Sequence, residues 1–125
     1  MRATVILKFV VIGILVGILS WAVCPLVSDR IEPFDTGLGF IIGQSMMFIA
    51  MIYAGYSTRS FLLVMLAVIG IYLGQVGYSY FAVGSEWIVL GMITIITLCV
   101  IPLLGGIIGW AAGRLVDWRA RKNAA

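Results

Sequence analysis

Four apolar stretches, each long enough to cross a lipid bilayer, constrain this chain more than any other feature. They cover residues 9–27, 37–56, 61–81 and 87–110, and none contains Asp, Glu, Lys or Arg. About 20 apolar residues in a helix span the ~30 Å hydrocarbon layer of a membrane. The sequence therefore predicts an all-α membrane protein with four transmembrane helices. The last of these continues to residue 118.

Composition supports this class and a single transmembrane domain over residues 1–125. The residues are 63% hydrophobic and 10% charged, and a soluble domain of this size could not bury so much apolar side chain. The connections are short, so the chain has no room for a separate extramembrane module. We expect the first apolar stretch to be retained, because Val23 precedes Cys24 and Pro25 follows it, a pattern that disfavours signal cleavage.

Charged residues predict how the helices are oriented. Basic residues lie at both ends of the chain and in the second connection: Arg2, Lys8, Arg59, Arg114, Arg119, Arg121 and Lys122. The other two connections are mostly acidic and contain Asp29, Arg30, Glu32, Asp35 and Glu86. Because Lys and Arg remain on the cytoplasmic side, we expect an up-down bundle with both termini in the cytoplasm. The last helix should extend into the cytosol. The net charge of +3 reflects this topology and does not indicate a nucleic-acid partner.

Glycines at every fourth position indicate where helix backbones can approach closely. At a rise of ~1.5 Å per residue, Gly13 and Gly17 of the first helix share the inner half of the membrane with Gly105 and Gly109 of the fourth. We therefore expect helices one and four to pair. The remaining glycines lie in the outer half of helices two and three, and a tight hairpin of these two helices would bring them into contact. Alternatively, these glycine faces contact a second copy or another subunit, or the glycines only reflect the usual composition of membrane helices. The full set of expected packing residues is Gly13, Gly17, Gly39, Gly43, Gly74, Gly77, Gly105, Gly109 and Gly113.

Each apolar stretch also carries one polar residue at a similar depth, and these form a candidate polar layer: Ser20, Gln44, Gln75 and Thr94. An amide in lipid is costly unless it is hydrogen-bonded, so Gln44 and Gln75 are expected to bond to each other. The layer has two interpretations. It either holds the helices together, or it lines a shallow pocket open to the outside, with Ser45 and Tyr78 as possible additions.

Residues able to perform catalysis or bind metals are scarce. The chain has no histidine and two cysteines, Cys24 and Cys99, at different expected depths and without a CxxC motif. Ion-coupled carriers usually place a charged residue inside a span, and these spans have none. Asp29, Glu32 and Asp35 form either a cation-attracting mouth or a solvated loop. Met46, Met47 and Met51 suggest packing rather than a soft-metal site. The sequence predicts no enzyme activity, cofactor or metal.

Pro102 is the one candidate for a bend. Proline removes the helical hydrogen bond to the carbonyl of Leu98, so the last helix should kink at Pro102, with Thr94 and Thr97 donating to the freed carbonyls. The kink is either static or a hinge.

The features together favour a small bacterial inner-membrane protein that acts without catalysis as a structural, accessory or assembly subunit. Its expected partners are the lipid bilayer and other membrane subunits, or a second copy of itself. One alternative is a homo-oligomeric channel or exporter for a small neutral or weakly polar solute, which would use Gln44 and Gln75. A further alternative is an immunity-type or lipid-associated protein.

Overall fold

The computed structural model describes residues 2–124, with Trp87 described by its backbone alone. Over this range it confirms an all-α chain with four helices long and apolar enough to span a membrane. Short 3₁₀ turns precede two of these helices. The elements are α1 (Ala3–Val27), η1 (Pro33–Asp35), α2 (Gly37–Thr58), α3 (Phe61–Val83), η2 (Ser85–Trp87), α4 (Ile88–Leu98) and α5 (Val100–Ala124).

Local chemistry explains where the central helices begin and end. The Thr36 hydroxyl accepts a hydrogen bond from the Gly39 N–H and so caps the start of α2. The Ser60 hydroxyl does the same for α3 by accepting from the Leu63 N–H. Between them, Arg59 ends α2 in the left-handed region at φ 52°, a conformation that is uncommon for a residue with a side chain.

The fourth span is interrupted where the missing proline N–H leaves a carbonyl free. α4 ends at Leu98, Cys99 forms a turn, and α5 begins at Val100. Pro102 cannot donate to the Leu98 carbonyl. The expectation that the threonines satisfy this carbonyl is wrong. The Thr97 hydroxyl donates to the Thr94 carbonyl, and the Thr94 hydroxyl donates further back, to Leu90 and Gly91.

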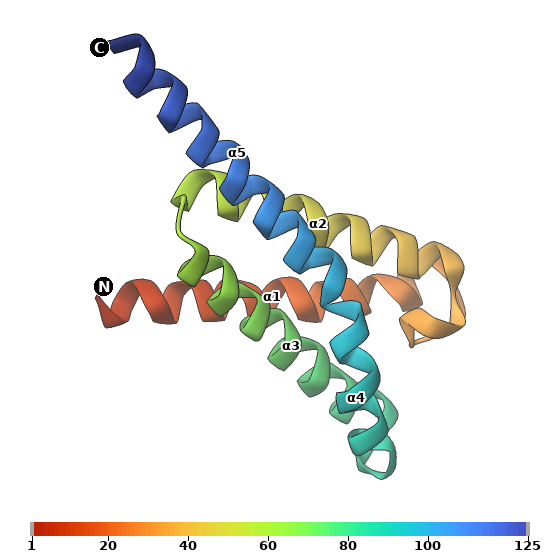
Figure 1. The fold of residues 1–125 in the computed structure, drawn as a ribbon. Coiled ribbons are helices and arrows are strands. Elements are labelled where there is room, and N and C mark those ends of the chain that lie inside the picture. The colour runs from red at the N-terminus through yellow and green to blue at the C-terminus, as the bar shows by residue number, and fades with distance from the viewer. Residues whose placement is uncertain (1, 125) are drawn as a thin grey trace.

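The helices pair across the chain rather than with their neighbours in sequence. α1 packs most extensively against α3, and α2 against α5 (Figure 1). α1 also contacts α2, whereas the consecutive helices α2 and α3 touch much less. Figure 1 shows the α2–α3 turn on the same side of the molecule as the N-terminus, with the other two connections on the opposite side.

Glycines make the α1–α3 crossing close. A Cβ added at Gly13 would collide with the Ala67 carbonyl, and one added at Gly17 with the Ile71 carbonyl. From the other side, a Cβ at Gly74 would collide with the Ile14 carbonyl. These backbones therefore touch directly, which glycine permits and any larger residue prevents.

The α2–α5 crossing uses the second set of glycines. Cβ atoms at Gly105 and Gly109 would meet the carbonyls of Phe48 and Ile52, and one at Gly113 would lie 2.9 Å from the Tyr56 carbonyl. The expected pairing of helices one and four is therefore wrong. Gly105 and Gly109 pack on α2, whereas the glycines of α1, Gly13 and Gly17, pack on α3.

The expected α2–α3 glycine hairpin is also wrong. A Cβ at Gly43 would lie 2.7 Å from the Ser20 carbonyl of α1, and one at Gly39 would meet Thr36 and Cys24. A Cβ at Gly77 would meet nothing within 4 Å. Gly39 and Gly43 of α2 therefore face α1, which lies between α2 and the glycine face of α3.

The apolar core lies where the helix pairs meet. It includes Met47 and Met51 of α2, which pack as buried core side chains. The other members come from α1, α3, α4 and the turn between α4 and α5: Trp21, Val64, Ala67, Ile71, Ile95, Leu98 and Cys99.

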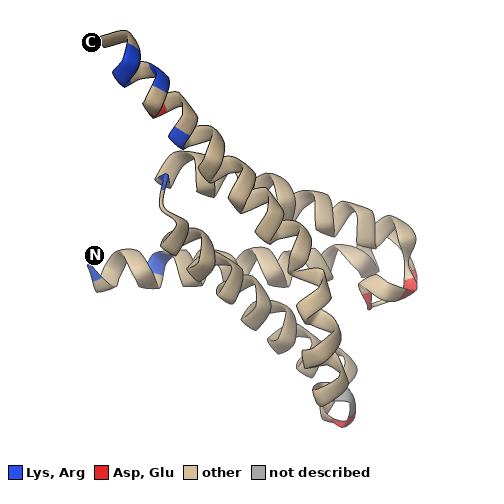
Figure 2. Cartoon of the chain, viewed as in Figure 1, with Lys and Arg blue, Asp and Glu red and all other residues tan. Residues whose placement is uncertain are grey.

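Charges separate to opposite sides of the molecule (Figure 2). Lys and Arg lie at the start of α1, at the α2–α3 turn and along the end of α5, whereas most carboxylates lie in the other two connections. Arg30 and Asp117 are the exceptions on their respective sides. The surface between these ends is largely apolar, as lipid contact requires.

Two glycines one turn apart in α3 test the importance of close approach. We expect Gly74→Ala to lower the free energy of unfolding by about 2 kcal/mol, because the methyl group would displace the α1 backbone. Gly77→Ala is the matched control. It should be neutral or stabilising by up to ~1 kcal/mol, since alanine favours helix and the site is open. Reversible unfolding in mixed detergent micelles measures both, and equal losses would contradict the α1–α3 contact.

Candidate functional site

A chain of hydrogen bonds through Gln75 connects three elements of the core. The Trp21 indole N–H of α1 donates to Gln75 Oε1 of α3 over 3.0 Å. Gln75 Nε2 in turn donates to Cys99 Sγ, in the turn after α4, over 3.7 Å. Gln75 is fully buried, so both halves of its amide are bonded inside the protein. This arrangement removes the cost of burying a primary amide in an apolar region.

Gln44 is not part of this chain. Its side chain is 6% exposed, and its Oε1 has no hydrogen-bond partner among the described residues. The expected bond between Gln44 and Gln75 is therefore wrong, since Gln75 is bonded to Trp21 and Cys99 instead. Both amides nevertheless lie around one interior gap, together with Ser20, and this gap has no room for a water molecule.

The four residues of the expected polar layer separate into two places. Ser20, Gln44 and Gln75 surround the interior gap, whereas Thr94 lines a different pocket. The Ser20 hydroxyl donates to the Gly17 carbonyl over 2.7 Å, so it is satisfied within its own helix. Ser45, considered as an addition, lies with Gln44 along an open apolar groove between α2 and α5.

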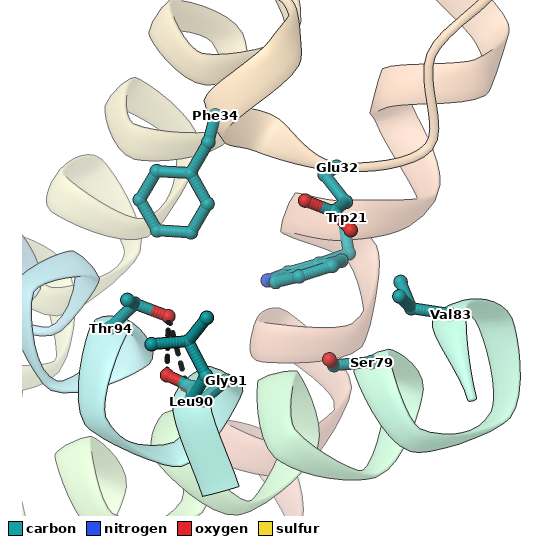
Figure 3. Close-up of a pocket in the computed structure, with 8 residues that line it drawn as sticks. All are labelled: Trp21, Glu32, Phe34, Ser79, Val83, Leu90, Gly91 and Thr94. Carbon is teal, nitrogen blue, oxygen red and sulfur yellow. Dashed lines mark hydrogen bonds between the residues drawn. The ribbon is translucent and has the colours of Figure 1, made fainter. Parts of the chain in front are cut away.

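The pocket lined by Thr94, called here the Glu32 pocket, lies between the α1–α2 connection and the ends of α3 and α4 (Figure 3). Its volume is about 300 Å³. Glu32 reaches down from the connection toward Trp21, and the ring of Phe34 faces the same space (Figure 3). The lining residues are Trp21, Glu32, Phe34, Ser79, Val83, Leu90, Gly91 and Thr94.

Trp21 forms the inner end of the Glu32 pocket. Its side chain is 2% exposed, and its ring lies against Tyr78, with 6.2 Å between the ring centroids and planes inclined by 54°. Because the indole N–H is bonded to Gln75, Trp21 contributes an apolar wall rather than a donor. The pocket therefore ends at the core and does not continue into the interior gap.

An acidic hollow adjoins the Glu32 pocket. Its lining includes Glu32 and Val83, which both spaces share, and its volume is about 340 Å³. The remaining lining residues are Asp29, Arg30, Ile31, Asp35 and Ala82. The three carboxylates considered as a cation-attracting mouth thus lie around one depression, and one of them also reaches the Glu32 pocket.

Arg59 forms a polar cluster at the opposite end of the molecule. Its Nε donates to the Gly113 carbonyl over 3.1 Å and lies 3.0 Å from Asp117 Oδ2. The guanidinium carbon lies 5.3 Å from the Tyr56 ring centroid, within cation–π range. From the sequence, Arg59 indicated orientation alone, and the role of Asp117, the one acidic residue in the C-terminal segment, was not predicted. This cluster attaches the α2–α3 turn to α5.

Comparison with known proteins found no matching family model, no matching curated protein and no matching solved structure. The proposed function therefore rests on the geometry of the structure. The Glu32 pocket offers one carboxylate, two hydroxyl-bearing residues and an apolar wall, a combination suited to holding a small ligand.

The two glutamines should respond differently to substitution. Gln75→Leu leaves the buried Trp21 N–H without an acceptor and should cost about 1–3 kcal/mol of unfolding free energy. Gln44→Leu removes an oxygen that has no partner, so it should be neutral or stabilising. Because the two amides share no bond, their effects should add in the double variant. Unfolding in detergent measures all three, and a larger loss at Gln44 than at Gln75 would contradict this assignment.

Proposed function

We propose that this chain is a multi-pass protein of a bacterial inner membrane, with its four spans in an up-down bundle and both termini in the cytoplasm. The charge separation supports this orientation. Basic residues at the start of α1, at Arg59 and along the end of α5 lie opposite the acidic connections (Figure 2), and Lys and Arg are retained on the cytoplasmic side.

The last span should leave the membrane on the cytoplasmic side. α4, Cys99 and α5 together comprise 37 residues, about 55 Å of helix at 1.5 Å per residue, which exceeds the ~30 Å hydrocarbon layer. We infer a static kink at Pro102. The interruption at Cys99 and the close packing of Gly105 and Gly109 on α2 support a fixed bend.

Within that membrane we propose a non-catalytic structural, accessory or assembly role. The supporting observation is the closed interior around Gln75, where the amide is bonded on both sides and the adjacent gap excludes water. A solute route needs polar groups that face a hydrated path, and these polar groups face one another. The outer faces of the helices are apolar and broad, so lipid and other membrane subunits are the proposed contacts.

The channel or exporter alternative requires a path between copies rather than through one copy. The groove beside Gln44 and Ser45, lined also by Phe40, Phe48 and Ile101, is the feature that favours it. Its walls are mainly apolar, so we place this alternative second.

Reporter fusions test the orientation. Fusions after Arg59 and Asn123 should report a cytoplasmic location, and insertions at Glu32 and Glu86 an external one, because the basic segments then all lie inside. An external C-terminus would overturn the proposed topology.

Purification from native membranes in mild detergent tests the role. An accessory subunit should migrate with a larger membrane complex and be recovered at fixed stoichiometry. Gly74→Leu, which disrupts the α1–α3 contact, should release it, whereas Gly77→Leu at the open site should not. Recovery of the unchanged chain as a homo-oligomer alone would favour the channel alternative.

A further inference from the structure

Glu32 holds a carboxylate at the edge of an aromatic pocket without a cation to neutralise it. Its side chain is half-buried and reaches toward Trp21 in Figure 3. Across residues 2–124, the single ion pair joins Arg59 to Asp117 at the other end of the molecule. Arg30 lines the adjoining hollow with Glu32 but makes no ion pair with it. A partly buried carboxylate in this position favours a cationic ligand.

The charged groups around the Glu32 pocket are mostly negative, as Glu32 itself is. The acidic hollow that adjoins the pocket brings Asp29 and Asp35 close to Glu32, and Glu86 lies in the other connection on that side of the molecule. Arg30 is the one base in these connections. Together these groups produce a negative potential at the pocket entrance, which attracts cations and repels anions.

The walls indicate an organic cation rather than a metal ion. Hard metal ions take about six or more oxygen ligands, whereas this pocket supplies a single carboxylate, and the Thr94 hydroxyl is bonded to its own helix. The Phe34 ring lines the pocket and is 49% exposed, so an ammonium group in the pocket can reach its π system. Leu90 and Val83 supply further apolar surface, on different sides of Trp21 (Figure 3).

We propose that the Glu32 pocket binds an organic ammonium ion that carries a short apolar arm. The ammonium group lies between the Glu32 carboxylate and the Phe34 ring, and the arm packs against Val83 and Leu90. The volume of about 300 Å³ is at the small end of known ligand pockets and accommodates an amine the size of phenethylamine. The same ammonium chemistry occurs in a free amine and in an aminophospholipid headgroup. The proposal goes beyond the accessory role and does not depend on it.

Titration of the purified full-length chain in an uncharged detergent tests the proposal. Phenethylamine should bind saturably, measured by calorimetry, and phenethyl alcohol, its neutral counterpart, should bind at least about tenfold more weakly. Glu32→Gln should weaken phenethylamine binding by about tenfold or more. Phe34→Leu should weaken it by several-fold, because it removes the π face and retains an apolar side chain.

Asp29→Asn is the matched control. It removes a neighbouring carboxylate that lines the acidic hollow but not the Glu32 pocket, so binding should weaken by less than about threefold. Circular dichroism confirms that each variant is folded. If Glu32→Gln does not fold, the comparison of amine with alcohol on the unchanged chain still decides the matter. Equal binding of amine and alcohol, or equal losses at Asp29 and Glu32, would overturn the proposal.

Competition then separates the two sources of the ammonium group. A short-chain phosphatidylethanolamine that displaces phenethylamine, while the matching phosphatidylglycerol does not, identifies the headgroup as a ligand. If neither lipid displaces the bound amine, the ligand is a free amine.

Discussion

Direct contact between helix backbones is the interaction on which the rest of this structure depends. In a membrane, lipid removes the hydrophobic drive that brings helices together in water, so association relies on packing and hydrogen bonds. Gly13, Gly17 and Gly74 bring α1 against α3, and Gly105 and Gly109 bring α5 against α2. The short distance between α1 and α3 then allows the Trp21 indole of one helix to reach the Gln75 amide of the other.

Which helices exist could be predicted from the sequence, but which helices pair could not. Length and apolarity define a span regardless of its neighbours, and the expected starts at residues 37 and 61 agree with the structure. α1 begins earlier than expected, at Ala3, and so includes the charged residue Lys8. A glycine spacing of four shows that a helix can be approached closely, and it does not specify the partner. The signal for the α1–α3 pair was Ala67 and Gly70, which continue the ladder of Gly74 on one face of α3.

The polar residues show a similar limit. Depth along a helix placed Gln44 and Gln75 around the same gap, but rotation about the helix axis decides which groups meet. Trp21 lies near the end of an apolar stretch, as aromatic residues at a membrane surface do, and its sequence position does not show that its N–H donates to a buried amide. Glu32 was recognisable as part of an acidic loop. Phe34 and Leu90 could not be assigned to its pocket, because that pocket depends on how two connections approach each other.

The interleaved pairing has a consequence for how the chain is made. α2 finds its main contact in α5, which is synthesised after α3 and α4, and the glycine face of α1 is covered only after α3 has been made. Contacts between elements distant in sequence form late, because a long loop must close first. Each helix that is made early therefore enters the membrane before its main packing face has a protein partner, and that face contacts lipid first. The bundle reaches its final arrangement only after α5 has been made, when Arg59 can bind Gly113 and Asp117.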